Sequence, residues 1–179
     1  AERLVVDAAL ELKSRGHSVH LFTAHHDETH CFEETRNGTL PVRVHGDWLP
    51  RHILGMGHAL FASLRCLIVA LAVYRSGIQF DAVFVDQVST AIPVLKFLVP
   101  NVKTLFYCHF PDLLLSKRGS WLKKLYRWPL DLMEQRTTGK ADLILVNSAF
   151  TAEVFAKTFR RLHRRGIRPH VLHPSEIGR

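Results

Sequence analysis

The chain has 179 residues, of which 47% are hydrophobic and 22% are charged. This length and composition suit one folded domain, or one lobe of a larger protein, and exclude an intrinsically disordered chain. The formal net charge of +8 is compatible with an anionic partner such as phosphate, nucleic acid or a lipid surface, although on charge alone a merely basic surface is the simpler explanation.

The three cysteines, Cys31, Cys66 and Cys108, are odd in number and far apart, which favours free thiols in a reducing compartment over a disulfide framework. Asn37–Thr39 matches the glycosylation acceptor pattern, but the cysteine usage argues against a lumenal location. The chain begins at Ala1 without a signal-peptide pattern and continues directly into a predicted helix, so we expect it to be truncated.

Helices and strands are predicted to alternate along the chain. The first element is an amphipathic helix over 2–16, where Leu4, Val5, Ala8, Ala9 and Leu12 share one face and Gly16 supplies a left-handed stop. Strands are predicted over 17–24, 40–46, 80–87, 102–110, 141–148 and 170–175. Helices are predicted over 57–77, 89–99, 120–138 with a kink at Pro129, and 149–166. The strands are continuous apolar runs, so the sequence predicts an α/β fold: a Rossmann-like parallel sheet with helices on both faces.

Polar residues occur at each predicted strand exit. Ligands of open parallel sheets bind at the carboxyl ends of the strands, so these residues are candidates for a site. They are His25 and His26, Asp86 and Gln87, His109 to Asp112, Asn147 and Ser148, and His173 to Ser175.

The stretch "FYCHFPDLLL" contains the most informative exit. His109 follows the strand, Pro111 would hold the loop rigid, and Asp112 could orient the imidazole or cap the next turn. A capping turn with a structural histidine is the alternative. The polar residues at the other exits favour a functional role.

No pattern indicates a metal or a nucleotide-binding loop. "HHDETHC" contains His25, His26, His30 and Cys31, but the spacing fits none of the zinc patterns, which favours a solvated loop. The sequence has no GxGxxG, Walker, GxSxG or HExxH motif.

Two helical segments are candidates for membrane contact. The apolar helix over 57–77 is interrupted by Arg65, which favours a buried helix or a membrane-surface contact over a bilayer span. In "SWLKKLYRWPLDLM" one side of the helix is apolar and the other is basic. Tryptophan beside lysine is typical of helices that lie on anionic membranes, but an ordinary helix that covers a sheet has the same pattern.

Long segments of the chain are similar to a known family. "AERLVVDAALELKSRGHSVHLFTAHHD", "GDWLPR", "FYCHFPDLLLSKR", "LYRWPLDLMEQRTTGKADLILVNSAFTAEVF" and "VLHPS" resemble the amino-terminal lobe of the eukaryotic α-1,3/1,6-mannosyltransferases of dolichol-linked oligosaccharide synthesis. These are retaining GT-B enzymes of glycosyltransferase family four. The resemblance implies that residues 1–175 form the acceptor-side lobe without its first strand, that 176–179 are a non-matching tail, and that the donor-binding lobe is absent.

The resemblance also implies an activity. Such an enzyme transfers mannose from GDP-mannose to a dolichol-diphosphate-linked GlcNAc2-mannose acceptor, first in α-1,3 and then in α-1,6 linkage, at the cytosolic face of the endoplasmic reticulum membrane. It requires no metal or other cofactor, and other mannosyltransferases of the pathway are possible partners. We expect the isolated chain to be inactive, because one half of a two-substrate site cannot position both reactants.

The resemblance assigns roles to individual residues. His109 is expected to contact the reacting sugars with support from Asp112, while Glu2 and Arg3 are expected to lie near the donor diphosphate. The residues expected to meet the acceptor diphosphate or lipid headgroups are Lys117, Arg118, Trp121, Lys123, Lys124, Arg127 and Trp128. The alternative is a non-catalytic membrane-peripheral or scaffolding module. Nucleic-acid binding is disfavoured, because the aromatic residues lie in apolar segments rather than on a basic platform.

Overall fold

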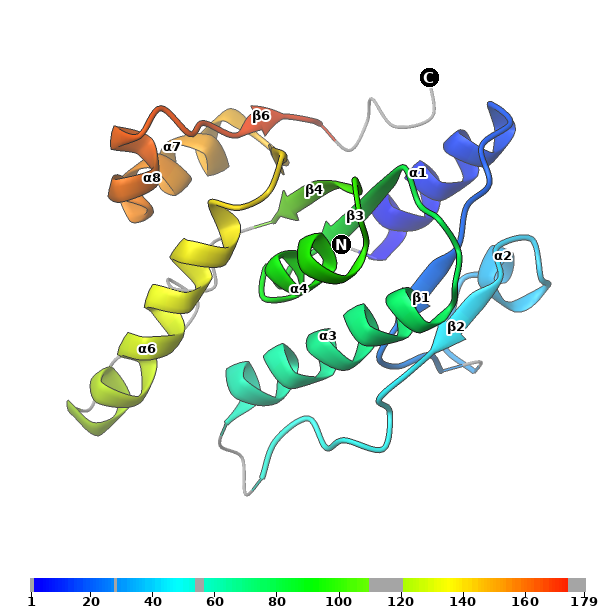
Figure 1. Cartoon of the computed structure of the whole chain (residues 1–179), viewed down its shortest axis with the longest axis horizontal. Helices are drawn as coiled ribbons and strands as arrows, with labels where there is room; N and C mark the ends of the chain where they lie inside the picture. The colour runs from blue at the N-terminus through cyan, green and yellow to red at the C-terminus, as the bar shows by residue number, and fades with distance from the viewer. Residues whose placement is uncertain (1, 28, 54–56, 110–120, 174–179) are drawn as a thin grey trace.

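The computed structural model describes residues 2–27, 29–53, 57–109 and 121–173, with the backbone alone at residue 2 and over 121–127 (Figure 1). The elements in chain order are α1 (Glu2–Ser14), β1 (Leu21–Thr23), α2 (Glu33–Arg36), β2 (Val42–Val44), α3 (His58–Arg75), β3 (Ala82–Asp86), α4 (Ala91–Leu98), β4 (Lys103–Cys108), α6 (Trp121–Thr138), β5 (Leu143–Val146), α7 (Ala149–Thr158), α8 (Arg160–Arg164) and β6 (His170–Val171). Helices and strands therefore alternate along most of the chain, as the sequence predicts.

The strands of the described residues form two parallel sheets. β1 pairs with β2, and the other strands lie in the order β3-β4-β5-β6. The register places Asp86 opposite Tyr107 and Val146 opposite Val171, so the carboxyl ends of the four strands lie along one edge. The predicted fold class is confirmed: parallel strands with helices on both sides, as in a Rossmann-like lobe.

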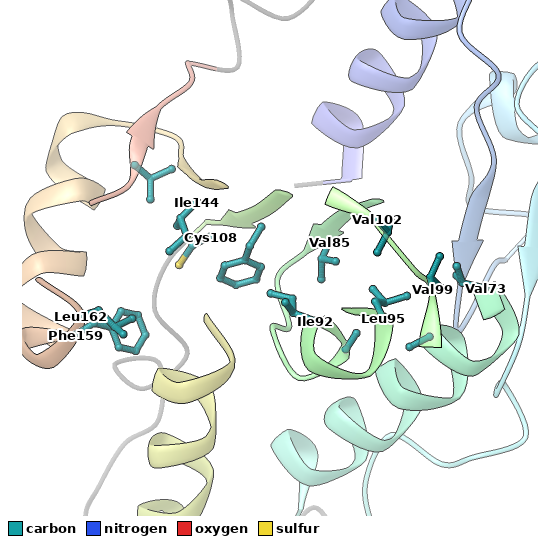
Figure 2. Close-up of a cluster of buried hydrophobic side chains, with 14 of the residues drawn as sticks. Val73, Val85, Ile92, Leu95, Val99, Val102, Cys108, Ile144, Phe159 and Leu162 are labelled. Carbon is teal, nitrogen blue, oxygen red and sulfur yellow. The ribbon is translucent and has the colours of Figure 1, made fainter. Parts of the chain in front are cut away.

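Alternate side chains of the four-stranded sheet enter two different cores. Val85, Phe106 and Ile144 point to the side covered by α3, α4, α7 and α8, and Figure 2 shows this cluster. Its most buried members are Ile92, Val146, Phe155 and Phe159, each 0% exposed. Burial of one such side chain stabilises the fold by roughly 1.5–3 kcal/mol, so this core holds the helices firmly on the sheet.

Helix α1 covers the opposite side of both sheets. Its first turn contributes Leu4, which packs against Tyr107 and Leu145 of the four-stranded sheet. Its middle contributes Val6 and Ala9 to a separate cluster beside β1. Because one helix contacts both sheets, α1 joins them into one body.

The two sheets also run in the same direction. Phe22 of β1 packs edge-to-face on Phe80, just before β3, with ring centroids 6.1 Å apart. At the other end, α3 contacts both exits: Arg65 donates to the carbonyl of Ala24 after β1, and the thiol of Cys66 donates to the carbonyl of Val88 after β3. The exits of β1 and β3 therefore face the same side of the molecule.

The structure differs from the sequence-based expectation at three elements. The helix expected over 149–166 is divided at Phe159, whose φ of −96° and ψ of 55° place its ring in the core, 4.8 Å from that of Phe155. Helix α4 begins at Ala91 rather than at Ser89, whose hydroxyl instead bonds with that of Thr137, 2.7 Å away. The short helix α2 lies between the strands predicted over 17–24 and 40–46, where no helix was predicted.

A candidate active site at the strand ends

A histidine and an aspartate meet where β3 and β4 end. Nε2 of His109 lies 2.8 Å from Oδ1 of Asp86. Asp86 is the last residue of β3, and His109 follows Cys108, the last residue of β4. Since the strands are parallel and adjacent, their carboxyl ends bring these two side chains together.

The chain makes a sharp turn at Gln87, directly after Asp86 at the end of β3. Gln87 has φ of +63°, the left-handed conformation that side chains other than glycine rarely adopt. Its amide still donates to the carbonyl of Tyr107, and the amide of Val88 donates back to the carbonyl of Asp86 at 2.8 Å. Such strained residues cluster at functional sites, where the surrounding structure holds them in place.

The pair is half-buried beside an aromatic wall. The side chains of His109 and Asp86 are 22% and 24% exposed, so a ligand can reach them. The Tyr107 ring centroid lies 4.6 Å from that of His109, and the Tyr107 hydroxyl donates to the carbonyl of Leu172. Burial, together with the nearby charge of Asp86, raises the pKa of Tyr107 above its usual value. Tyr107 therefore stays neutral near pH 7, and its ring packs against that of His109.

The partner that the structure shows for His109 is Asp86. Asp112 lies outside the described residues, so its supporting role stays a prediction. The sequence marked Asp86 only as a polar exit. Its pairing with His109 depends on the register between β3 and β4, and no local sequence signal gives that register.

Arg3 is bound by neighbouring side chains. Its guanidinium lies 2.8 Å from Oδ1 of Asp7 and 3.2 Å from Oε1 of Glu34, and it stacks over Phe32. A diphosphate would have to compete with these carboxylates. The side chain of Glu2 is not described, so the predicted diphosphate contact of both residues stays a prediction.

The predicted membrane-contact residues are described only in part. Lys117 and Arg118 lie outside the described residues, and Trp121, Lys123, Lys124 and Arg127 are described by backbone position on α6 alone. The side chain of Trp128 is exposed and lines a groove of about 750 Å³ between α6 and α8. The basic residues around this groove are Arg136, Lys140, Arg161 and Arg165.

The polar exit of β5 serves the following helix. Ser148 is the N-cap of α7, and its hydroxyl oxygen accepts a hydrogen bond from the amide of Thr151. The hydroxyl of Thr151 in turn donates to Oδ1 of Asn147. Ser148 therefore satisfies one of the free amides at the start of α7, a structural role.

The exit of β1 leads into a second polar cluster. Nδ1 of His25 lies 2.7 Å from Oδ1 of Asp47, which also accepts a hydrogen bond from Arg65 at 3.0 Å. Sequence reasoning noted Arg65 only as an interruption of an apolar helix and did not single out Asp47. Among the described residues, no three His, Cys, Asp or Glu side chains come together to hold a metal ion.

Helix α3 is long and apolar enough to cross a membrane by length and composition, but core helices pass the same test. Here α3 packs on α4 and β1, and Arg65 and Cys66 contact the strand exits. A guanidinium that is ion-paired in mid-helix fits a helix packed on a sheet. The exposed apolar side chains of α3 are Leu60, Leu64 and Tyr74.

Comparison with known proteins agrees with this arrangement. The sequence model of Glycosyltransferase Family 4 matches residues 1–162. The chain is 53% identical over 175 residues to the alpha-1,3/1,6-mannosyltransferase ALG2 of Rhizomucor pusillus. This match covers 97% of this chain and 38% of that protein. It is 55% identical over 178 residues to human ALG2, covering 98% of this chain and 42% of the relative. It is 46% identical over 176 residues to ALG2 of Saccharomyces cerevisiae, and this match covers 97% of this chain and 34% of the relative.

The chain thus spans about two fifths of the length of the first two of these relatives. The family match and the resemblance seen in the sequence agree with each other and with the parallel α/β fold. The chain belongs to glycosyltransferase family 4.

Proposed function

We propose that this chain forms the acceptor-side lobe of a mannosyltransferase that acts in N-glycan precursor assembly. The donor would be GDP-mannose and the acceptor a dolichol-diphosphate-linked GlcNAc2-mannose, with transfer in α-1,3 and then α-1,6 linkage. The observation that carries the proposal is the His109–Asp86 pair at the strand ends of a family 4 lobe that is 46–55% identical to the three ALG2 relatives.

The pair has the chemistry to position a sugar hydroxyl. When Nε2–H of His109 donates to the Asp86 carboxylate, the neutral ring has its lone pair on Nδ1. We assign the substrate contact to Nδ1, which accepts a hydrogen bond from a hydroxyl of the donor or acceptor sugar. Asp86 fixes the ring orientation and tautomer, so it is a positioning residue. Retention of configuration in this class needs no protein nucleophile, and none is assigned.

The start of α1 supports a nearby place for the donor diphosphate. Leu4, in the first turn of α1, packs against Tyr107, whose ring lies against that of His109. The amino end of this 13-residue helix therefore lies close to the candidate site. Free amides and the helix dipole favour an anion at such an end. This contact itself needs no metal, and the absence of a cofactor stays a prediction.

We also propose that the lobe rests on the cytosolic face of the endoplasmic reticulum membrane. The formal net charge of +8 favours an anionic surface, and Trp128 is 68% exposed beside a basic groove. The exposed apolar residues of α3 add a second surface of the kind that enters a lipid interface. We further propose that the lobe contacts other mannosyltransferases of the pathway.

A chimera tests the activity. In it, this chain replaces the matching segment of the Rhizomucor pusillus relative, so that the remaining residues of the relative supply the second lobe. The purified chimera is incubated with GDP-mannose and a diphosphate-linked GlcNAc2-mannose lipid, and the products are resolved by mass spectrometry. We expect addition of one and then two mannose residues, and no product from the isolated chain.

The same preparation distinguishes the second candidate, a membrane-peripheral module without catalysis. The exposed Trp128 is the observation that favours it. Binding to anionic vesicles by a folded chimera that transfers no mannose would favour this candidate and contradict the proposed enzyme.

A further inference from the structure

The cluster of His25, Asp47 and Arg65 at the exit of β1 is not used by the chemistry proposed for His109. Its three members come from three separate segments: the loop after β1, the loop after β2, and α3. Arg65 donates to Oδ1 of Asp47 at 3.0 Å and to the carbonyl of Ala24 at 2.8 Å, while Nδ1 of His25 lies 2.7 Å from the same carboxylate oxygen. We call these three residues the Asp47 cluster.

The local fold brings the loop after β2 against α3. Gly46 has φ of +93°, and a Cβ there would lie 3.1 Å from Cγ2 of Ile68 on α3. Only glycine combines this conformation with so close an approach. The amide of His45 donates to the carbonyl of Thr23, which ties the two loops together. Asp47 is therefore held at one place relative to α3.

The three side chains of the Asp47 cluster differ in how far they are exposed to solvent. The Arg65 side chain is 10% exposed, whereas those of Asp47 and His25 are 50% and 41% exposed. Nε of Arg65 is buried and has no hydrogen-bond partner among the described residues. A cation is expensive to bury, so a purely structural pair would enclose its carboxylate as well. Here a buried cation fixes a carboxylate that faces solvent.

The carboxylate stays ionised over a wide pH range. The hydrogen bond with His25 lowers the pKa of Asp47. Burial opposes this shift, but the charges of His25, Arg65 and Arg51 add to it, so the net pKa lies below its usual value. The exposed members are thus a fixed hydrogen-bond acceptor and an imidazole. A carboxylate that faces outward repels phosphate, whereas neutral hydroxyl groups donate to it readily.

The Asp47 cluster lies on the same side of the molecule as the His109–Asp86 pair. Arg65 and Cys66 are consecutive on α3: the first contacts Ala24 and Asp47, and the second contacts the carbonyl of Val88, two residues after Asp86. Figure 1 shows α3 alongside α4, with its later half close to β1. A ligand longer than one sugar that occupies the His109 site can therefore extend toward the cluster.

We infer that His25 and Asp47, held in place by Arg65, form a subsite for the hydroxyl groups of a neutral sugar in the acceptor oligosaccharide. This inference rests on the proposed mannosyl transfer and adds the part of the substrate that the second cluster recognises. Asp47 accepts hydrogen bonds from two neighbouring hydroxyls, and His25 contributes one more polar contact at the rim. Arg65 does not touch the sugar and is a positioning residue.

The test separates acceptor binding from donor binding and from turnover. Asp47→Asn and His25→Ala are introduced into the chimera, and initial rates are measured while GDP-mannose and the lipid acceptor are varied in turn. We expect a rise of about tenfold in the acceptor KM for Asp47→Asn, which is the loss of one charged hydrogen bond of about 1.4 kcal/mol. The KM for GDP-mannose and kcat should change by less than a factor of about three.

Asp27→Asn is the matched control. Asp27 is an exposed carboxylate in the same loop, but it binds the hydroxyl and amide of Thr29 rather than the cluster. We expect unchanged kinetics for this variant. His25→Ala keeps the Asp47–Arg65 ion pair, so it tests the subsite even when Asp47→Asn unfolds.

The free oligosaccharide GlcNAc2-mannose, used as a competitive inhibitor, supplies a readout that does not depend on the lipid. Its inhibition constant should rise in parallel with the acceptor KM in both cluster variants. Unchanged acceptor KM and inhibition constant in His25→Ala and in folded Asp47→Asn would overturn the subsite, as would a rise in the KM for GDP-mannose alone. A wild-type chimera without any transfer would instead overturn the proposed function.

Discussion

Oδ1 of Asp86 and Nε2 of His109 lie 2.8 Å apart, although 23 positions separate the two residues in the chain. The contact joins the ends of two adjacent parallel strands. It converts an isolated histidine at a strand exit into an oriented group, because the carboxylate selects the ring nitrogen that carries the proton.

His109→Ala in the chimera should lower kcat/KM for mannose transfer by about a hundredfold or more, since it removes the group that meets the reacting sugars. Asp86→Asn should cost about tenfold to a hundredfold, the equivalent of one hydrogen bond to a charged group. Steady-state kinetics measure both. Asp81→Asn, an exposed aspartate just before β3, is the control and should behave as wild type. Near-normal turnover in a folded His109→Ala variant would remove His109 from the site.

Asp142 should contribute stability that disappears in acid. Burial opposes its ionisation, but hydrogen bonds from Lys96 and from the amide and hydroxyl of Thr104 outweigh burial and lower the pKa of Asp142 to about 2. A folded-state pKa below the unfolded value of 3.8 stabilises the fold above pH 4, and this contribution is lost as the pH falls from about 4 to 2.

Asp142→Asn should therefore lower the free energy of unfolding at pH 7 by about 1–2 kcal/mol, measured by urea denaturation of the chain. The difference from wild type should shrink at pH 2. Glu153→Gln is the control, because its ion pair with Lys157 is highly exposed and should matter little. A difference that stays constant between pH 7 and pH 2 would contradict the assigned cause.

Gly139→Ala should destabilise the contact between the end of α6 and α8. A Cβ at this position would lie 2.6 Å from Cδ2 of Leu162, which is 3% exposed and has little room to move. We expect a loss of about 1–3 kcal/mol in unfolding free energy, the usual cost of overpacking. In a Leu162→Ala background the same substitution should cost much less, and equal costs in both backgrounds would exclude this clash.

Cys66 should react slowly with alkylating reagents while the chain is folded. Burial raises the pKa of its thiol to about 11, so very little thiolate is present at pH 7. Mass spectrometry after brief iodoacetamide treatment should show Cys66 largely unmodified in the folded chain and rapidly modified in urea. Equally fast labelling in both states would show that the helix does not protect this thiol.

Local sequence patterns determined the order of helices and strands and the class of fold. The buried strands around Phe84, Phe106 and Ile144 are continuous apolar runs, which only a sheet covered on both faces can bury. Polar residues follow these apolar runs at the strand exits, so the sequence marks both His109 and Asp86 as candidates. The sequence motifs shared with the mannosyltransferases also indicated the family, because they are long and specific.

Tertiary structure alone decided which of these candidates meet. The pairing of His109 with Asp86 requires the register of β3 against β4, and the approach of Arg65 to Asp47 requires α3 to pack against a loop more than ten residues away. Helix periodicity is a local property of the chain, whereas strand register and helix packing depend on contacts between distant segments. For the same physical reason, two histidines, two aspartates and an arginine that are dispersed in the sequence form two polar clusters at one side of the fold.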